Sequence, residues 1–241
     1  MGKISAGNYD LNVWLEGGYD SGIMTTFYGG PGSGKTNLCM IVAVSQAKKG
    51  NKVIFIDTEG GFSSERAKQL FFSKSTNEIK ENLEIDKVLE NILVLKPTNF
   101  KEQQQAFDQL LKHVKEQVSL IIVDGMTMLY RLDFADARSS EENNIENMQT
   151  VNAELTNQMR LLVEIARKNN IPVIVTNQIY KWKDETRMVA GDIIKYWSKC
   201  LIELENESGK RTAHLRKHRS IGEKSLSFQI HDSGIRKKGW L

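Results

Sequence analysis

The stretch GGPGSGKT, residues 29–36, decides the fold of this 241-residue chain. It matches the eight-position phosphate-binding loop G-x-x-x-x-G-K-[ST] at every fixed position. An apolar run, residues 23–28, precedes it, and a helical pattern that extends to about Lys49 follows it. In this setting, backbone N–H groups and the helix dipole converge on phosphate oxygens. The stretch therefore predicts an α/β protein that binds ATP and Mg²⁺.

The positions of this loop have predicted tasks in nucleotide binding. Lys35 reaches the β- and γ-phosphates as a mobile positive charge, and the Thr36 hydroxyl ligates Mg²⁺. The alternative is a chance glycine-rich turn, which the flanking strand and helix patterns disfavour. The predicted cofactor-binding residues in this segment are Gly29, Gly30, Pro31, Gly32, Ser33, Gly34, Lys35, Thr36 and Asn37.

Short apolar runs alternate with longer helical patterns along the chain, which is typical of crossover units around a mainly parallel sheet. No internal repeat, low-complexity segment or linker is evident. We therefore expect a single α/β domain over residues 1–241, with a mainly parallel twisted sheet flanked by helices and with antiparallel strands at its C-terminal side. The predicted strands cover residues 53–56, 92–95, 120–123 and 173–176, and the antiparallel ones cover 200–204, 212–215 and 226–230.

Helices are expected between these strands. Residues 63–72 read as one helix, and Asn99 and Glu102 have the capping-box spacing that opens another. From Ile145 onward, apolar residues recur at the intervals of a long amphipathic helix. The polar stretch 133–144 lacks such periodicity and is expected to be a loop.

Three polar residues near predicted strand ends complete the candidate site. Asp124 follows an apolar strand, and because ligands of open α/β sheets bind at strand carboxyl ends, it should hold Mg²⁺ together with Thr36. Glu59, in VIFIDTEGG, can polarise the water that attacks the γ-phosphate. Gln178, at the end of VIVTNQ, can sense the γ-phosphate. Taken singly, each is also an ordinary turn, cap or loop residue.

The composition is that of an ordinary folded protein, with 40% hydrophobic and 26% charged residues. No apolar run reaches the roughly 18 residues of a membrane span, and the N-terminus lacks an apolar signal core, so a cytoplasmic protein without a membrane partner is expected. Cys39 and Cys200 lie in apolar stretches and are expected to be buried thiols. Residues 209–241 carry a net charge of +7 and the remainder −4, and such a tail can attract phosphate backbones unless it is simply a solvated surface.

The motifs GGPGSGKT, IDTEGGFSSER, LIIVDG and VTNQ, in this order and at this spacing, resemble the RecA/RadA recombinase superfamily over nearly the whole chain. Four details are similar to the short archaeal paralogues of RadA. These are the early segment ISAGNYDLNVWLEGGYDSG, the short connection between Gln178 and Asp192, the segment AGDIIKYWSKC, and KHRS at 217–220. The resemblance implies a RecA-like P-loop NTPase core with ATP and Mg²⁺ as ligands.

The resemblance also implies roles for single residues. Arg66, in SSER, would stack its guanidinium face on the adenine, the alternative being an ordinary helix-surface position. Glu59 would be the water-activating acid, and with Lys35 and Gln178 it forms the predicted catalytic set. RadA carries an N-terminal helical domain and a linker with an aromatic polymerisation motif, for which this chain has no room. Self-association is therefore possible, but an independent filament is not expected.

Two segments correspond to the DNA-facing loops of RecA relatives, residues 131–146 and 179–191. The first has a net charge of −3 and would repel a phosphate backbone. The second interleaves rings and cations, as single-strand binders do, and a basic cluster, LRKHR at 215–219, lies further along. Without a base-reading motif, sequence-independent DNA binding that weakens steeply with salt is expected. The candidate DNA contacts are Lys181, Trp182, Lys183, Arg187, Arg216, Lys217, His218 and Arg219.

The leading hypothesis is an ATP-binding accessory protein of DNA repair and homologous recombination. It would bind single-stranded or branched DNA and hydrolyse ATP weakly with little DNA stimulation. It would modulate a RadA-type recombinase or a Holliday-junction resolvase without exchanging strands itself. The alternative is a ring-forming RecA-type motor or KaiC-like signalling ATPase, for which Arg211, Arg216 and Arg219 are candidate arginine fingers. A small-molecule kinase is disfavoured, because neither a lid segment nor a paired-arginine acceptor site is evident.

Overall fold

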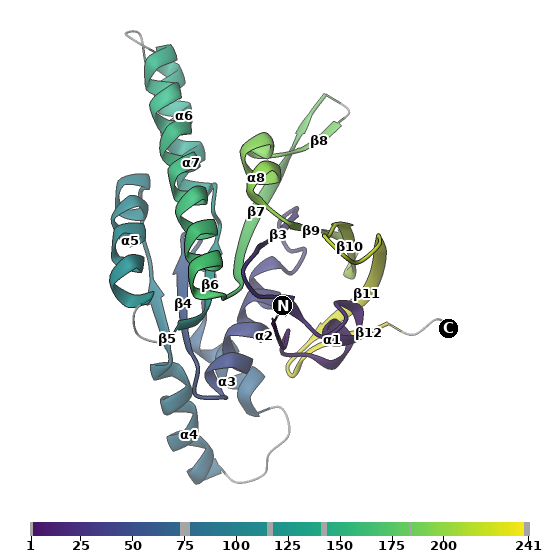
Figure 1. Cartoon of the computed structure of the whole chain (residues 1–241). Helices are drawn as coiled ribbons and strands as arrows, with labels where there is room; N and C mark the ends of the chain where they lie inside the picture. The colour runs from purple at the N-terminus through teal and green to yellow at the C-terminus, as the bar shows by residue number, and fades with distance from the viewer. Residues whose placement is uncertain (1, 73–77, 115–117, 141–143, 184, 239–241) are drawn as a thin grey trace.

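The computed structural model describes residues 2–72, 78–114, 118–140, 144–183 and 185–238 (Figure 1). Its helices are α1 (Tyr9–Trp14), α2 (Lys35–Ala47), α3 (Ser64–Phe72), α4 (Glu78–Glu90), α5 (Phe100–His113), α6 (Met128–Ser139), α7 (Asn144–Asn169) and α8 (Gly191–Trp197). Its strands are β1 (Lys3–Ile4), β2 (Tyr19–Asp20), β3 (Met24–Gly29), β4 (Lys52–Asp57), β5 (Ile92–Leu95), β6 (Val118–Asp124), β7 (Val173–Trp182), β8 (Glu185–Met188), β9 (Cys200–Glu207), β10 (Lys210–Lys217), β11 (Lys224–His231) and β12 (Gly234–Lys237).

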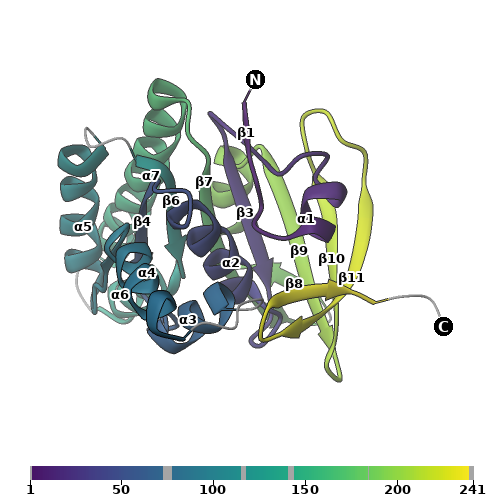
Figure 2. The same cartoon turned by 90° about the horizontal axis from the view of Figure 1, so that it is seen from below.

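The main sheet has the strand order β12-β11-β10-β9-β3-β7-β6-β4-β5. The strands from β9 to β5 pair in parallel, and β9 to β12 pair antiparallel, so the predicted parallel sheet with an antiparallel C-terminal side is confirmed. Figure 2 shows the antiparallel strands curving around α1 at the opposite side from α5. Parallel pairing brings the carboxyl ends of the central strands to one edge, where ligands of such sheets bind.

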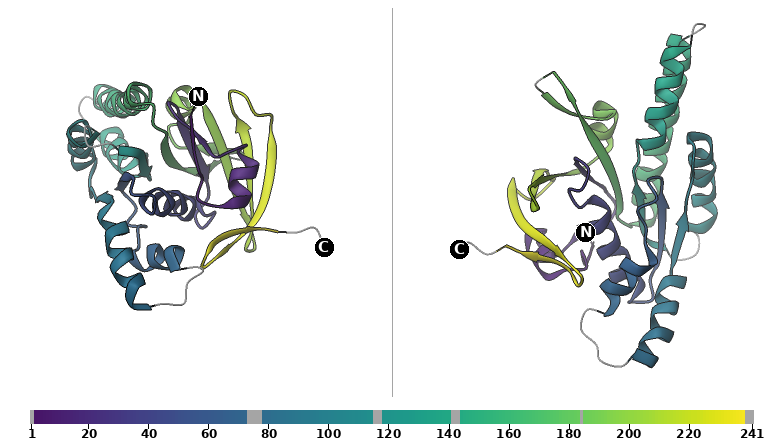
Figure 3. Two further views of the ribbon diagram at one scale, coloured as in Figure 1. Left: turned by 60° about the horizontal axis from the view of Figure 1, so that its bottom comes forward. Right: turned by 180° about the vertical axis from the view of Figure 1, so that it is seen from behind.

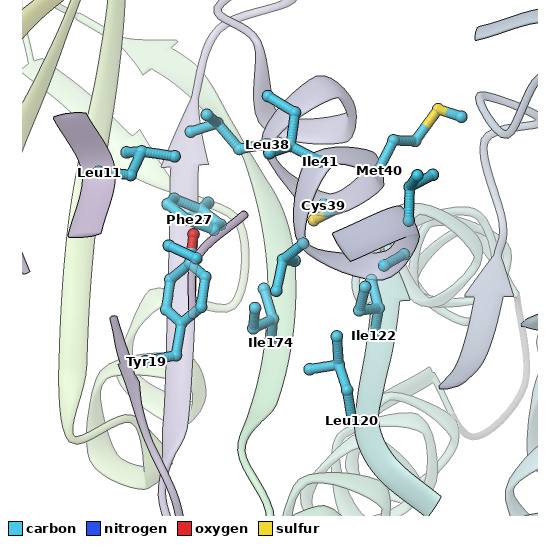
Figure 4. Packing of buried hydrophobic residues seen from close by; sticks show 14 of the residues in the cluster. Leu11, Tyr19, Phe27, Leu38, Cys39, Met40, Ile41, Leu120, Ile122 and Ile174 are labelled. Carbon is cyan, nitrogen blue, oxygen red and sulfur yellow. The ribbon is translucent and has the colours of Figure 1, made fainter. Parts of the chain in front are cut away.

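Helices cover both faces of the parallel part, with α2, α3 and α4 on one side and α5, α6 and α7 on the other (Figure 1). Side chains alternate along β4: Val53 and Phe55 join the core under α2, while Ile54 and Ile56 join the core under α5 and α7. This burial on both faces explains why the strand is a continuous apolar run. Figure 4 shows the α2 side of the core, including Cys39, which is buried and unbridged as predicted.

Local sequence signals set several element ends. Asn99 accepts a hydrogen bond from the Glu102 backbone N–H at 2.9 Å, and the Glu102 carboxylate accepts one from the Thr98 N–H, so the predicted cap of α5 is confirmed. Gly50, which follows α2, has φ +79°, the left-handed conformation in which many helices end.

Two predictions about the polar segments are wrong. Residues 133–139, expected in a loop, continue α6, because Tyr130 and Phe134 lie one turn apart with their rings stacked at 5.6 Å, and α6 packs along α7. Strand β7 does not end at Thr176 but runs on to Trp182 and pairs with β8, so residues 179–188 form a β-hairpin instead of a loop. Glu141 and Glu142, counted in the acidic segment, lie outside the described residues. Among the residues that are described, no helix is both long and apolar enough to cross a membrane.

Candidate nucleotide site and nucleic-acid interface

The predicted site residues come together at the carboxyl edge of the parallel strands. The last residue of β3, Gly29, is in register with Gln178 of β7, and Asp57 of β4 is in register with Asp124 of β6. Glu59 follows β4 by two residues. The strand order therefore places on one edge four motifs that are far apart in the sequence.

The phosphate loop connects β3 to α2 in the geometry that its glycines require. Gly32 and Gly34 have φ of +69° and +104°, a region that side chains rarely adopt. Gly34 is the residue preceding the first turn of α2, and its carbonyl accepts the Leu38 N–H at 3.0 Å. The helix N-terminus thus points its free N–H groups at the loop.

Lys35 is buried and turned back over the loop. Its Nζ donates to the carbonyl oxygens of Gly29 and Gly30, both at 2.9 Å, and to Gln178 Oε1 at 3.4 Å. Burial lowers the pKa of Lys35, and the carboxylates of Glu59 and Asp124 oppose that shift. The ammonium is therefore held at the centre of the loop by bonds that phosphate oxygens could replace.

Gln178 bridges the cation and the acid of the site. Its Nε2 donates to Glu59 Oε1 and Oε2, both at 3.2 Å, while its Oε1 accepts from Lys35. The amide has one donor end and one acceptor end, so the bridge fixes its orientation. A change at Lys35 can reach Glu59 through this single side chain.

Asp124 is a buried carboxylate with one free oxygen. Thr176 Oγ1 donates to its Oδ1 at 2.7 Å and accepts the Gly125 N–H, while its Oδ2 has no hydrogen-bond partner within the described part of the chain. Burial raises the pKa of Asp124 to about 6, against the lowering influence of the Thr36 and Thr176 hydroxyls. An oxygen of this kind, beside a threonine hydroxyl, fits a divalent cation.

The residues around the loop enclose a cavity of about 350 Å³. Its described lining includes Lys35, Thr36, Glu59 and Gln178, as the sequence predicted. Ser33 Oγ and Asn37 Nδ2 are also buried without a partner among the described residues, and free polar atoms of this kind suit a polar ligand. The donor and acceptor set therefore fits a nucleotide phosphate chain with Mg²⁺.

Three residues of the antiparallel strands reach the phosphate loop or line the cavity. Arg211 of β10 and Ile230 of β11 line it, and Asn206 donates to the Gly32 carbonyl at 3.1 Å. No local motif marks them, because they approach the loop through the fold and lie about 170 to 200 positions further along the chain.

Arg66 lies beside the site, with its N–H groups engaged within the chain. Its Nε donates to Asn37 Oδ1 at 2.9 Å, and its Nη atoms donate to the carbonyls of His231 and Asp232 and to Gln69 Oε1. The side chain therefore ties α3 to α2 and to the turn between β11 and β12. It does not line the cavity, and its stacking on adenine stays a prediction.

Most of the second predicted DNA segment forms the β7–β8 hairpin, which projects beyond the sheet in Figure 1. Lys181, Lys183 and Arg187 are exposed, and Arg187 pairs with Glu185 at 2.7 Å. The side chain of Trp182 lies outside what the structure describes. Strand β7 also carries Gln178, so the hairpin continues directly from the part of the strand that lies at the candidate nucleotide site.

Residues of this hairpin and of α6 line an aromatic groove of about 570 Å³. Figure 3 (right) shows the ribbons of the two elements from behind. Tyr130, Phe134 and Tyr180 supply its rings, and Arg131 and Arg138 supply its positive charge. Tyr180 is 37% exposed, so its ring is accessible from solvent. Rings and arginines in one groove are the groups on which single-stranded bases stack.

The basic cluster LRKHR is bonded within the chain and is not a free charged surface. Lys217 Nζ donates to the carbonyls of Lys195 and Ser198, and Arg216 pairs with Glu203 at 2.7 Å. Arg219 pairs with the buried Asp20 at 2.8 Å.

His218 in the same cluster is almost fully buried. Its Nδ1 accepts the N–H groups of Ser220 and Ile221. Burial lowers the pKa of His218. The structure thus gives the whole cluster a role in holding the C-terminal strands, and the DNA contacts predicted for it find no support in this geometry.

The strand order, the phosphate loop between β3 and α2, and the acid at the end of β6 define the class: this is a RecA-type P-loop protein. The Rad51 family model matches residues 1–238, and the chain belongs to the Rad51 family. It is 38% identical to the DNA repair and recombination protein RadB of Methanobrevibacter smithii over 95% of this chain and 93% of that one. It is 39% identical to the RadB protein of Methanocaldococcus jannaschii over 93% and 98% of the two chains.

A solved structure is similar over the same range. The crystal structure of the RadB recombinase superposes with a TM-score of 0.76 at 34% identity and covers 96% of this chain and 97% of that chain. RadB is the short archaeal paralogue of RadA to which the sequence details point. That resemblance is therefore confirmed.

Proposed function

We propose that this chain is an ATP-binding accessory protein of DNA repair and homologous recombination. One observation supports this most strongly: Gln178, within β7, joins Lys35 to Glu59, and the same strand continues to Trp182 in the exposed β7–β8 hairpin. A nucleotide-dependent change at Gln178 would be transmitted along the strand to the hairpin. The shared name of the RadB relatives supports the biological role.

Each residue of the site has a proposed task. Lys35 neutralises the β- and γ-phosphate oxygens in place of the loop carbonyls that it now contacts. Thr36 and the free Oδ2 of Asp124 hold Mg²⁺, with Thr176 fixing the other carboxylate oxygen. Bound Mg²⁺ neutralises charge that develops on the phosphates. Glu59 orients the attacking water.

Hydrolysis should be slow for a reason visible in the site. Both carboxylate oxygens of Glu59 accept hydrogen bonds from Gln178. Gln178 therefore occupies part of the acceptor capacity with which Glu59 would polarise a water molecule. ATP would then act mainly as a conformational ligand, and Gln178 would report its presence to the hairpin.

DNA would bind at the β7–β8 hairpin and the adjoining aromatic groove. The hairpin supplies Lys181 and Lys183 for the phosphate backbone, and the groove supplies Tyr180 for base stacking. Neither surface carries a pattern that reads base edges, so binding would be independent of sequence. A RadA-type recombinase and a Holliday-junction resolvase are the proposed protein partners.

The alternative, a ring-forming motor, needs an arginine that reaches the site of the next subunit. Arg216 and Arg219 are paired with Glu203 and Asp20, and Arg211 contacts the phosphate loop of its own chain. These bonds favour the accessory role over the ring, because each candidate finger is already engaged within the chain.

The proposal can be tested by titrating labelled single-stranded and branched DNA by anisotropy, with and without ATP and Mg²⁺. Lys35→Ala should abolish nucleotide binding and the effect of ATP on DNA affinity, while leaving DNA binding without ATP intact. Lys181→Ala/Lys183→Ala should weaken DNA binding and reduce the slope of log K against log salt by about 1.4. Lys101→Ala/Lys112→Ala, which removes two exposed lysines of α5, is the matched control.

Two results would contradict the proposal. An unchanged salt dependence in the hairpin variant would remove the proposed DNA surface. DNA-stimulated ATP turnover of many cycles per second in the purified protein would contradict the role of ATP as a conformational ligand.

A further inference from the structure

Arg211 reaches the phosphate loop from the C-terminal strands of the same chain. It is the second residue of β10, directly after the turn at Ser208 and Gly209. Its Nε donates to the Gly32 carbonyl at 3.1 Å, the same oxygen that accepts from Asn206. The turn between β9 and β10 is therefore fastened to the middle of the loop by two side chains.

The Arg211 side chain lies close to the phosphate loop at its Cδ as well as at its Nε. A Cβ placed on Gly34 would lie 3.6 Å from Arg211 Cδ and 3.4 Å from Ile230 Cδ1. The stem of Arg211 thus packs against the loop backbone, and its guanidinium lies at the wall of the 350 Å³ cavity. Among the described residues, Lys35 and Arg211 are the cations that line this cavity.

We propose that Arg211 is a second phosphate-binding cation of the nucleotide site, supplied in cis by the antiparallel strands. The inference rests on the proposed function and deepens it. Its Nε is held by Gly32 and its Nη1 donates to the Gly209 carbonyl at 3.4 Å, which leaves the N–H groups of Nη2 to bind an anion in the cavity. A guanidinium is always charged and is suited to phosphate oxygens. The site is then complete within one chain, without a charge from a neighbouring copy.

This assignment has a structural competitor, because Arg211 could serve only to fasten the turn to Gly32. Asn206 separates the two roles, since it makes the same contact with Gly32 and carries no charge. Lys210 offers the opposite control: it is the adjacent residue, exposed and positively charged, but it does not line the cavity.

The experiment measures binding of a fluorescent ATP analogue with Mg²⁺ to the full-length protein and to the variants Arg211→Gln, Asn206→Ala, Lys210→Gln and Lys35→Ala. We expect Arg211→Gln to lose about tenfold or more in affinity, because it removes a charge-assisted contact with phosphate. Asn206→Ala and Lys210→Gln should change the affinity less than about threefold. Thermal melting of each variant without nucleotide checks that it is folded.

Mixing two defective proteins tests whether the cation acts in cis. If Arg211 served a neighbouring copy, an equimolar mixture of Lys35→Ala and Arg211→Gln would regain tight sites, since each protein supplies the group that the other lacks. In cis, the mixture should bind no more tightly than Arg211→Gln alone.

The outcomes are distinguishable. Equal losses of nucleotide affinity in Arg211→Gln and Asn206→Ala would show that Arg211 only fastens the turn to Gly32. Equal affinities in Arg211→Gln and Lys210→Gln would show that Arg211 is not part of the site. Recovery of tight binding in the mixture would show that Arg211 acts in trans. Each of these overturns the inference while the nucleotide site stands. Absence of binding by the unmodified protein would remove the proposed function and the inference together.

Discussion

Replacing Asp124 by asparagine should stabilise the nucleotide-free protein at pH 8. The carboxyl is 1% exposed, and one of its oxygens has no partner among the described residues. Burial raises its pKa from 3.8 to about 6. At about 1.36 kcal/mol per pKa unit, keeping the charged form costs the fold about 3 kcal/mol. Asparagine removes that charge, and an unpartnered amide N–H offsets about 1 kcal/mol of the gain.

The pH dependence of this effect follows from the direction of the shift. Because the folded-state pKa lies above the unfolded-state value, the cost is absent below about pH 4, grows as the pH rises, and is complete above about pH 6. The advantage of Asp124→Asn should therefore be about 2 kcal/mol at pH 8 and about 1.4 kcal/mol smaller at pH 5. For a chain of this length, the gain at pH 8 corresponds to a Tm higher by about 4–8 °C.

The assay is urea or thermal unfolding at both pH values, with Asp108→Asn as a control for an exposed carboxylate of α5. The control should stay within about 0.5 kcal/mol of the unmodified protein. A loss of stability in Asp124→Asn at pH 8, or a gain of the same size at pH 5 and pH 8, would refute the reasoning. With Mg²⁺ and a non-hydrolysable ATP analogue added, the unmodified protein should become more stable than Asp124→Asn, because only the carboxylate holds the metal.

Three further predictions follow from contacts elsewhere in the chain. Gln178→Ala should change ATP affinity less than about threefold but abolish the effect of ATP on DNA affinity, because it breaks the contact between Lys35 and Glu59. DNA anisotropy with and without nucleotide measures this effect. If ATP still changed the DNA affinity of the variant, the nucleotide would act on the hairpin by another route. Arg219→Ala should cost about 2 kcal/mol in urea unfolding, because it removes the nearest cation from the buried Asp20 and leaves only the Lys3 and His218 nitrogens, each at 3.5 Å, among the described residues. Arg187→Ala, in an exposed pair, should cost under about 1 kcal/mol, and equal losses would contradict this. Asn99→Ala should lower the free energy of unfolding by about 1 kcal/mol, because it removes the hydrogen bond that caps α5. Thr150→Ala, at a position in α7 that caps no helix, is the comparison and should lose less.

The gathering of the candidate site residues at one edge of the sheet could be predicted because these residues follow rules that are local in sequence. The phosphate loop is a contiguous motif, and Asp124 stands directly after a run of buried strand residues. Parallel strands then bring these ends together without any further information. The cap at Asn99 is equally local, since donor and acceptor are three residues apart.

Features stabilised by distant partners could not be predicted in the same way. Residues 133–139 show no apolar periodicity, and their helix depends on packing against α7, which begins at Asn144. Arg219 looks like free surface charge in the sequence, but its partner Asp20 is 199 positions away. The sequence therefore does not show which charges of the cluster at 215–219 are paired within the chain, nor that Arg211 contacts the phosphate loop of its own chain.

The antiparallel strands contribute residues to the candidate nucleotide site and do not only extend the sheet. Arg211 holds the phosphate loop from β10, and Arg66 of α3 holds the turn after β11 through two carbonyls. Ile230 of β11 lines the cavity wall. A ligand that displaces the loop contacts of Lys35 would act on β7 through Gln178, and one that moves the Gly32 carbonyl would act on β9 and β10 through Asn206 and Arg211. The proposed coupling between nucleotide and DNA requires only the contact with β7.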